Sequence, residues 1–117
     1  MPLIFLLAVN LFFDTSKVVW TTPPAHDFGE ILRGSDATFT FTFRNVSDAT
    51  LTLDNVRTEC SCTATDWDAA PIAPNESGKI TVSFDTKKVG FFKKKMTVWI
   101  RGQRKPEKIS IEGEVIE

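Results

Sequence analysis

The chain has 117 residues, of which 42% are hydrophobic and 25% are charged, and these values are ordinary for one soluble globular domain. Its formal net charge of -1 argues against nucleic acid as a partner, because binding to phosphates needs a clear basic excess. Ten phenylalanines and no tyrosine indicate a core built of hydrocarbon rings.

The first residues form a segment of their own. An apolar stretch from Leu3 to Phe13 is interrupted only by Asn10. It is shorter than the ~20 residues of a typical spanning helix and matches the apolar part of a secretion signal. No Lys or Arg precedes it and no Ala-x-Ala cleavage site follows it. The alternative is therefore a first strand or an apolar helix of the mature fold.

We interpret residues 1–14 as an export signal or its remnant, and residues 15–117 as the folded domain. Residues up to about Phe13 are then expected to lie outside the packed structure, so that a chain beginning near Thr15 would fold with an unchanged melting temperature. The domain itself is expected in the periplasm or cell envelope.

The next segments alternate between extended runs and turn residues. Lys17 to Thr22 is a short extended piece closed by two prolines, and Asp27 to Leu32 is a second one, ended by the turn Arg33 to Asp36. In the run Thr38 to Arg44, three phenylalanines alternate with threonines. Because side chains of a strand alternate between its faces, this run is a half-buried strand with its rings on one side.

The second half of the chain continues the pattern. Thr50 to Thr63 reads as one long strand whose apolar positions change parity, which predicts a bulge or bend near Asp54 and Asn55. Thr65 to Ser77 reads as a loop. Three further strands are expected over Gly78 to Asp85, Phe91 to Arg101 and Lys108 to Ile116. The cluster Lys93 to Lys95 is interpreted as a strand edge that lysine protects against aggregation.

About seven strands with turn signals between them and no convincing helix predict an all-β fold, an immunoglobulin-like two-sheet antiparallel β-sandwich. The residues expected to be buried together between the sheets are Phe39, Phe41, Phe43, Val82, Phe84, Val98 and Ile111.

Several short motifs follow one another in a recognisable order. They are Asp27-Phe28-Gly29, the strand Phe39 to Asn45, Cys60-Ser61-Cys62-Thr63, Ile72 to Gly78, Phe84-Asp85-Thr86, and Ile111-Glu112-Gly113-Glu114-Val115. This order resembles the bacterial family known as domain of unknown function 1573, over Asp27 to Val115. Two positions depart from the family pattern, which has glycine where this chain has Ser61 and Asn75. Asn tolerates left-handed geometry, so the change at Asn75 is benign.

The resemblance implies an immunoglobulin-like domain, related in shape to Hydin-type and major-sperm-protein-type domains and usually exported. It implies no activity, because the family has none assigned. The relatives of this fold mostly bind proteins, which is an analogy of fold alone.

Cys60 and Cys62 are the only constellation that could carry chemistry, and three interpretations are open. They are two small buried thiols, a disulfide, or part of a soft-metal site for copper(I) or zinc. On a regular strand, Cα atoms two residues apart lie ~6.6 Å apart and the sulfurs do not meet. We therefore predict two free thiols with no metal between them. His26, far away in sequence, is expected at the surface and not as a ligand.

One further group of residues is a candidate for binding. Trp67, with Asp66 and Asp68 on either side, is expected in the loop after the cysteines. Trp67 either covers the open end of the sandwich or acts as a binding hot spot.

The carboxylates show no pairing suited to acid-base catalysis, and the chain has neither a nucleophile elbow nor a glycine-rich phosphate loop. The sequence therefore predicts a non-enzymatic interaction module without a cofactor, which binds an unknown protein partner outside the cytoplasm. It predicts neither nucleic-acid binding nor membrane contact by the folded domain. The alternative is a thiol redox or copper(I)-binding protein that uses Cys60 and Cys62.

Overall fold

The computed structural model describes residues 16–117, and this part of the chain forms eight strands and no helix. No helix in that range could therefore cross a membrane. The strands are β1 (Val18–Trp20), β2 (Ala25–Leu32), β3 (Ala37–Asn45), β4 (Thr52–Thr58), β5 (Thr63–Trp67), β6 (Ser77–Phe84), β7 (Gly90–Arg101) and β8 (Glu107–Ile116). The prediction that residues up to about Phe13 lie outside the sandwich concerns residues that are not described, so it stays a prediction.

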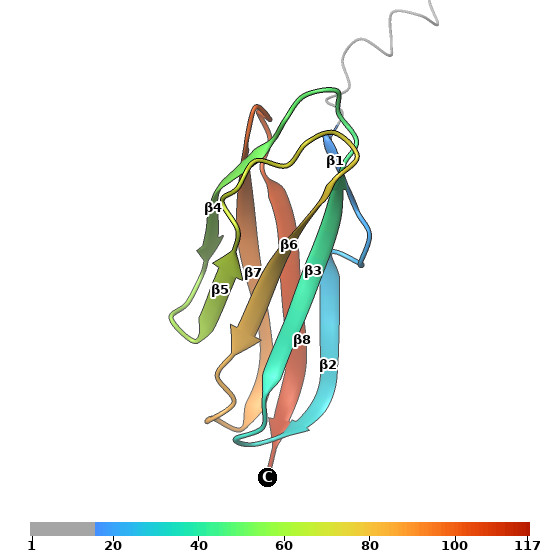
Figure 1. Ribbon diagram of the computed structural model, residues 1–117. Helices are drawn as coiled ribbons and strands as arrows, with labels where there is room; N and C mark the ends of the chain where they lie inside the picture. The colour runs from blue at the N-terminus through green and yellow to red at the C-terminus, as the bar shows by residue number, and fades with distance from the viewer. Residues whose placement is uncertain (1–15) are drawn as a thin grey trace, which may run out of the picture.

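The strands form two four-stranded sheets that face each other (Figure 1), in the orders β1-β3-β6-β5 and β2-β8-β7-β4. All neighbouring strands are antiparallel except β2 and β8, which run parallel. The predicted immunoglobulin-like sandwich is confirmed. It has one strand more than expected, because β5 forms where the sequence predicted the end of a long strand and a loop.

Strand β3 shows why the sequence pattern determines this fold. Phe41 and Phe43 are 0% and 1% exposed, and Phe39, on the same face, is half-buried. The threonines face outward and pair through their hydroxyls with the next strands, as in the contact of Thr40 with Thr81 at 3.1 Å. The rings are thus buried in the core on one face of the strand, and the hydroxyls make hydrogen bonds on the other face.

The core lies between the two sheets and includes most of the residues that the sequence predicted. Phe41, Phe43, Val82, Val98 and Ile111 belong to one buried cluster. The other two predicted core residues, both phenylalanines in the first sheet, pack against this cluster but remain partly exposed.

One end of the sandwich, which we call the closed end, is organised around the buried side chain of Asn45 at the end of β3. Its Nδ2 donates hydrogen bonds to the carbonyls of Ala49 and Ile72, at 2.8 and 2.9 Å. Its Oδ1 accepts from the backbone N–H and the hydroxyl of Ser47, at 2.9 and 2.7 Å. The backbone of Asn75, in the predicted left-handed conformation with φ 69°, donates to the Asn45 carbonyl. The Asn45 side chain thus joins the loop after β3 to the segment around Ile72, and neither of these lies in a named strand.

Strand β4 contains the predicted bulge, because its register against β7 shifts between Leu53 and Asn55. The strand then ends at Thr58, which lies opposite Met96. The prediction of one strand from Thr50 to Thr63 is therefore wrong in its last part. There the chain crosses from one sheet to the other, and residues 59–62 form the turn that makes this crossing.

Candidate functional site

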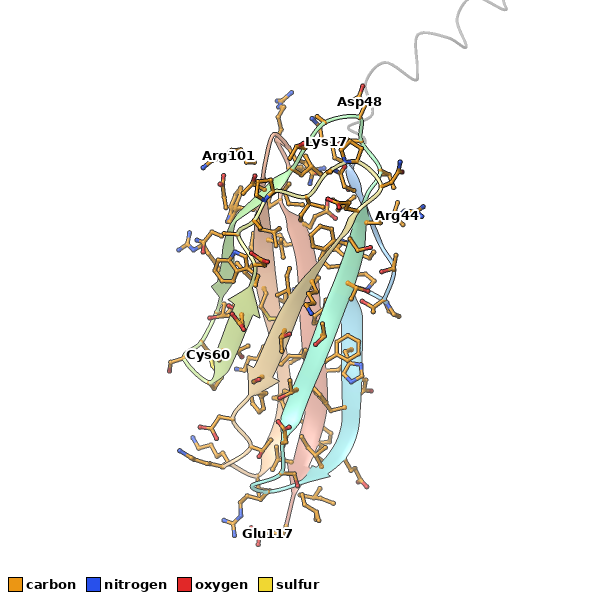
Figure 2. The ribbon with its side chains drawn as sticks, in the orientation of Figure 1. Lys17, Arg44, Asp48, Cys60, Arg101 and Glu117 are labelled. Carbon is orange, nitrogen blue, oxygen red and sulfur yellow. A yellow bond between two sulfur atoms is a disulfide. The ribbon has the colours of Figure 1, made fainter. Side chains whose placement is uncertain are left out.

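Cys60 and Cys62 lie in that crossing turn, about halfway along the molecule between Asp48 at one end and Glu117 at the other (Figure 2). The two sulfurs form a disulfide, and no described cysteine is free. The prediction of two free thiols is wrong. It assumed a flat strand, whereas the backbone turns here and Thr63 N–H donates to the Cys60 carbonyl at 3.2 Å. The turn shortens the distance between the two Cα atoms to 5.3 Å, which is within the disulfide range.

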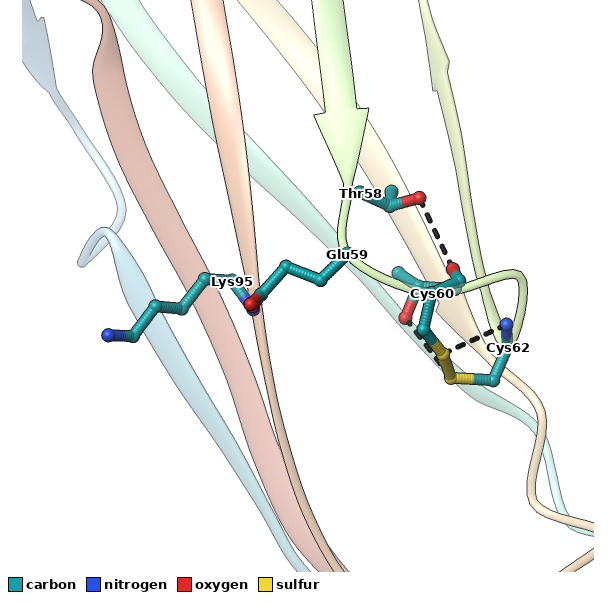
Figure 3. Close-up of a disulfide and its surroundings, with 6 residues drawn as sticks. Thr58, Glu59, Cys60, Cys62 and Lys95 are labelled. Carbon is teal, nitrogen blue, oxygen red and sulfur yellow. Dashed lines mark hydrogen bonds between the residues drawn. A yellow bond between two sulfur atoms is a disulfide. The ribbon is translucent and has the colours of Figure 1, made fainter.

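The turn is fixed to both sheets, and Figure 3 shows its contact with β7. Glu59 Oε1 accepts the backbone N–H of Lys95 in β7 at 2.8 Å, at the point where β4 no longer pairs with that strand. The carbonyl of Cys62 accepts the backbone N–H of Asp85, just after β6, at 2.9 Å. Within the turn, Thr58 Oγ1 donates to the Cys60 carbonyl at 3.2 Å. The disulfide is therefore held in place by backbone contacts on two sides.

A cavity of about 460 Å³ lies beside Cys62. Phe84 and Phe92, one from each sheet, form its apolar wall by stacking with ring centroids 3.8 Å apart. Its other lining residues are Gly90, Phe91 and Lys94 of β7 and, from the connection between β6 and β7, Asp85, Lys87, Lys88 and Val89. We call this end of the sandwich the open end. Strand β4 pairs with β7 only from Met96 onward, so residues 90–95 of β7 have no described strand beside them on that side.

The structure separates His26 from the cysteines. His26 lies in β2, and the cysteines follow β4, which is at the opposite edge of the same sheet. The imidazole is half-buried and stacks on Phe39, with ring centroids 3.8 Å apart. It is therefore not the simple surface residue that the sequence predicted, because Phe39 of the neighbouring strand β3 partly covers it. Among residues 16–117 no group of three metal-ligating side chains occurs.

Trp67 and its two aspartates do not form one surface. Asp66 and Trp67 belong to β5 and not to a loop as predicted, and the alternation of a strand directs them to opposite faces. Trp67 is half-buried and packs against the core, opposite Ile80. Asp66 and Asp68 are exposed, and Asp68 Oδ1 accepts the backbone N–H of Ala70 at 2.8 Å. The arrangement favours a covering role for Trp67.

The most exposed aromatic side chain among residues 16–117 lies elsewhere, on the outer face of β7. Phe91 is 84% exposed. It borders a second cavity of about 430 Å³, whose lining contains one lysine, Lys93, and four carboxylates. The carboxylates come from β2 and β8 and are Asp27, Glu30, Glu112 and Glu114. We call Phe91 and these four carboxylates the acidic face.

The sequence contained a signal for Phe91 that the sequence analysis did not use. Phe91 and Phe92 are adjacent on a strand, so one of the two rings has to point outward. The parity of the buried residues Met96 and Val98 assigns Phe92 to the inside and Phe91 to the solvent.

Comparison with known proteins shows what this chain is similar to. A family model described as "Protein of unknown function (DUF1573)" matches residues 19–115. No curated protein sequence matches the chain.

Solved structures share the fold at low sequence identity. A protein of unknown function from Porphyromonas gingivalis W83 superposes with a TM-score of 0.71 and 18% identity; the match covers 87% of this chain but only 48% of that one. The ASH/PapD-like domain 7 of human CEP192 gives 0.73 and 10%, covering 88% and 87%. WR4, a C. elegans MSP family member, gives 0.59 and 9%, covering 87% and 100%. These similarities establish the fold.

Proposed function

The chain belongs to the family of proteins of unknown function DUF1573, and we propose that it is a non-enzymatic interaction module that binds a protein partner outside the cytoplasm. The observation that carries this proposal is the exposure of Phe91. A phenylalanine that stays 84% in water forgoes the roughly 1.5–3 kcal/mol that its burial would contribute. Aromatic side chains of this kind become the anchors of interfaces, where a pocket of the partner covers them.

The charges around Phe91 define the partner. Four carboxylates and one lysine line the outer cavity that Phe91 borders, which gives this face a clear negative excess. We expect the partner to present arginines or lysines around an apolar pocket, because complementary charges steer association and fix orientation. Phosphate groups of nucleic acids or anionic lipids would be repelled by the same carboxylates, so we expect neither as a partner of this face.

The lysines on β7 favour binding through side chains over the addition of a strand. Beyond Met96 no described strand covers this edge of β7, and Lys93, Lys94 and Lys95 lie along it. Lysines on an exposed edge discourage another chain from pairing with it. This agrees with the interpretation of the cluster as a protected edge, and it makes Phe91 the anchor of the interface.

Two features support a location outside the cytoplasm. The Cys60–Cys62 disulfide is of a kind that persists in oxidising compartments and is rare in the cytosol. The apolar stretch from Leu3 to Phe13 matches the apolar part of a secretion signal. Fractionation of native cells tests this directly: we expect the protein in the envelope or periplasmic fraction, and recovery in the cytosol alone would contradict it.

The partner can be tested by placing a photo-crosslinking amino acid at position 91 or at position 99. Trp99 lies on the same face of β7 and is 38% exposed, but it does not line the acidic face. We expect a crosslink to a specific envelope protein from position 91 and not from position 99. The affinity of this envelope protein for the purified Phe91→Ala variant should be at least tenfold lower than its affinity for the wild type, as for other hot-spot residues.

Two further variants separate the anchor from the charges. Replacing Glu112 and Glu114 by glutamine should weaken the complex and reduce its dependence on salt, because screened surface charges then contribute less. Trp99→Ala should leave the affinity unchanged. Equal binding by the wild type and by Phe91→Ala would refute the proposed interface.

A further inference from the structure

We propose that the Cys60–Cys62 disulfide is a thiol–disulfide exchange site that accepts electrons from a small anionic thiol entering the cavity beside Cys62. This goes beyond the proposed function, because it concerns a different surface and a chemical step. Phe91 borders both cavities, but the acidic face lies on the outside of the sheet, whereas Cys62 and Lys94 line the space at the open end.

The disulfide contributes little to the stability of the fold. The two cysteines are only two residues apart, and the loss of unfolded-state entropy that a disulfide causes grows with the length of the loop it closes. This bond therefore lies at the low end of disulfide stabilisation. The hydrogen bonds of Glu59 and of the Cys62 carbonyl already hold the turn against both sheets. A role in chemistry explains the pair of cysteines better than a structural role does.

The disulfide is accessible from the side of Cys62. Both cysteines are half-buried, and Cys62, but not Cys60, lines the cavity. An incoming thiolate therefore reaches the sulfur of Cys62, and Cys60 is the leaving group. The backbone N–H of Cys62 already points at Cys60 Sγ, at 3.1 Å. A hydrogen bond to the sulfur that becomes a thiolate stabilises the charge that develops there.

Lysines dominate the charge of the cavity. Lys87, Lys88 and Lys94 line it together with a single carboxylate, Asp85. That carboxylate lies 3.9 Å from Lys87 in an exposed ion pair, so the excess is positive. Ammonium groups near a cysteine favour its thiolate form, and they attract an anionic reductant. Alternation along β7 turns Lys94 to the same side as the buried residues Phe92 and Met96, toward the space beside Cys62.

The reaction balances with thiols as the only reductant. A thiolate attacks Cys62 Sγ, the sulfur–sulfur bond breaks, and Cys60 leaves as a thiolate. A second thiolate attacks the outer sulfur of the mixed disulfide and releases Cys62. Two electrons pass from two thiols to the protein, the two thiols become one small-molecule disulfide, and their protons go to Cys60 and Cys62.

The charge preference can be measured with three thiols of the same two-carbon skeleton, namely 2-mercaptoethanesulfonate, 2-mercaptoethanol and cysteamine. The oxidised protein is mixed with each, and new cysteine thiols are alkylated and counted by mass. The rates of reduction are compared at equal concentrations of thiolate. We expect the sulfonate to react about tenfold faster than cysteamine at low ionic strength, and this ratio of rates to decrease in high salt. A ratio near one, a protein that carries free thiols when purified from its native compartment, or no reduction of the folded protein would overturn the proposal.

Substitutions then locate the charges. Lys87→Gln and Lys88→Gln, both in an exposed connection, should each lower the ratio about twofold, as for a single charge roughly 12 Å from the charge of the thiol in weakly screening water. Adding Lys94→Gln should bring the ratio close to one. Lys105→Gln, in the turn at the other end of β7, is the matched control and should change nothing. An unchanged ratio in the double variant Lys87→Gln/Lys88→Gln would refute the role of the cavity.

The direction of attack has a test of its own. Each single substitution, Cys60→Ser or Cys62→Ser, leaves one cysteine in the chain. The remaining thiol is mixed with the disulfide of mercaptoethanesulfonate, and the mixed disulfide is followed by mass. Cys62 in the first variant should react several-fold faster than Cys60 in the second, because only Cys62 lines the cavity. The reverse order would overturn the assignment of Cys62 as the attacked sulfur.

Discussion

At the closed end and the open end of the sandwich, the groups that lie where strands stop are treated in opposite ways. At the closed end Asn45 is completely buried and all four of its side-chain hydrogen bonds stay within the protein. At the open end β4 stops at Thr58, and β7 continues without a strand on that side. The first arrangement contributes to stability, whereas the second leaves an aromatic ring, lysines and a disulfide accessible to other molecules.

Two phenylalanines express the same difference. Phe41 is 0% exposed and Phe91 is 84% exposed, although both lie in strands of the same domain. Substitution of Phe41 should therefore change the free energy of unfolding and leave no specific functional signature. Substitution of Phe91 should do the reverse.

The largest expected effect is that of Phe41→Ala. Truncating a fully buried phenylalanine removes its transfer free energy and leaves a cavity, so the free energy of unfolding should fall by about 3–5 kcal/mol. Urea denaturation of the wild type and the variant measures this. Phe39→Ala, on the same face of the same strand but half-buried, is the matched control and should cost less. Equal losses at the two positions would contradict the burial gradient along β3.

Asn45→Ala should have the next largest effect. The substitution removes the hydrogen bonds to Ala49 and Ile72 and leaves buried carbonyl groups with fewer donors. We expect a loss of about 2–3 kcal/mol in the free energy of unfolding, as for buried polar groups that lose a partner. Asn55→Ala, at the exposed bulge of β4, should change it by no more than about 0.5 kcal/mol. A small effect at Asn45 would mean that the loops of the closed end are held by other contacts.

The sequence predicted which strand faces are buried better than it predicted the open end, for a physical reason. The alternation of Phe39, Phe41 and Phe43 with threonine is local information, because a strand sorts its own side chains by parity. The bulge near Asn55 was predicted in the same way, from a change of parity, and the register confirms it. Such patterns predict which face is buried without knowledge of the neighbouring strands.

The open end depends on where strands stop, which parity does not show. Thr58 and Cys60 are two residues apart, so the alternation pattern predicted that the strand continues past Thr58. The chain instead turns there, and this turn is set by contacts with distant residues, Lys95 and Asp85. The free-thiol prediction failed for this reason. Phe91 is different, since its exposure follows from its neighbour Phe92 and was within reach of the sequence.

The double replacement of Cys60 and Cys62 by alanine should have a smaller effect than either substitution at the closed end. In the loop-entropy model, closing so short a loop contributes about 1.6 kcal/mol at 25 °C. We expect the free energy of unfolding to fall by about 1–2 kcal/mol, and wild-type protein with a reduced disulfide to lose a similar amount. A loss above about 4 kcal/mol would show that the bond is a structural element of the fold and would weaken the case for exchange.

The smallest expected effect on stability is that of Phe91→Ala, and it is the most informative one. The ring contributes almost no buried surface in the isolated domain, so the free energy of unfolding should change by no more than about 0.5 kcal/mol. The affinity for the partner should nevertheless fall at least tenfold, because the ring becomes buried only in the complex. Denaturation and affinity measurements on the same preparation separate the two quantities. Phe92→Ala, one residue further along and 9% exposed, should instead destabilise the fold. If Phe91→Ala destabilised the domain as much as Phe92→Ala, the ring would already be packed within the isolated domain, and the open end would not offer it to a partner.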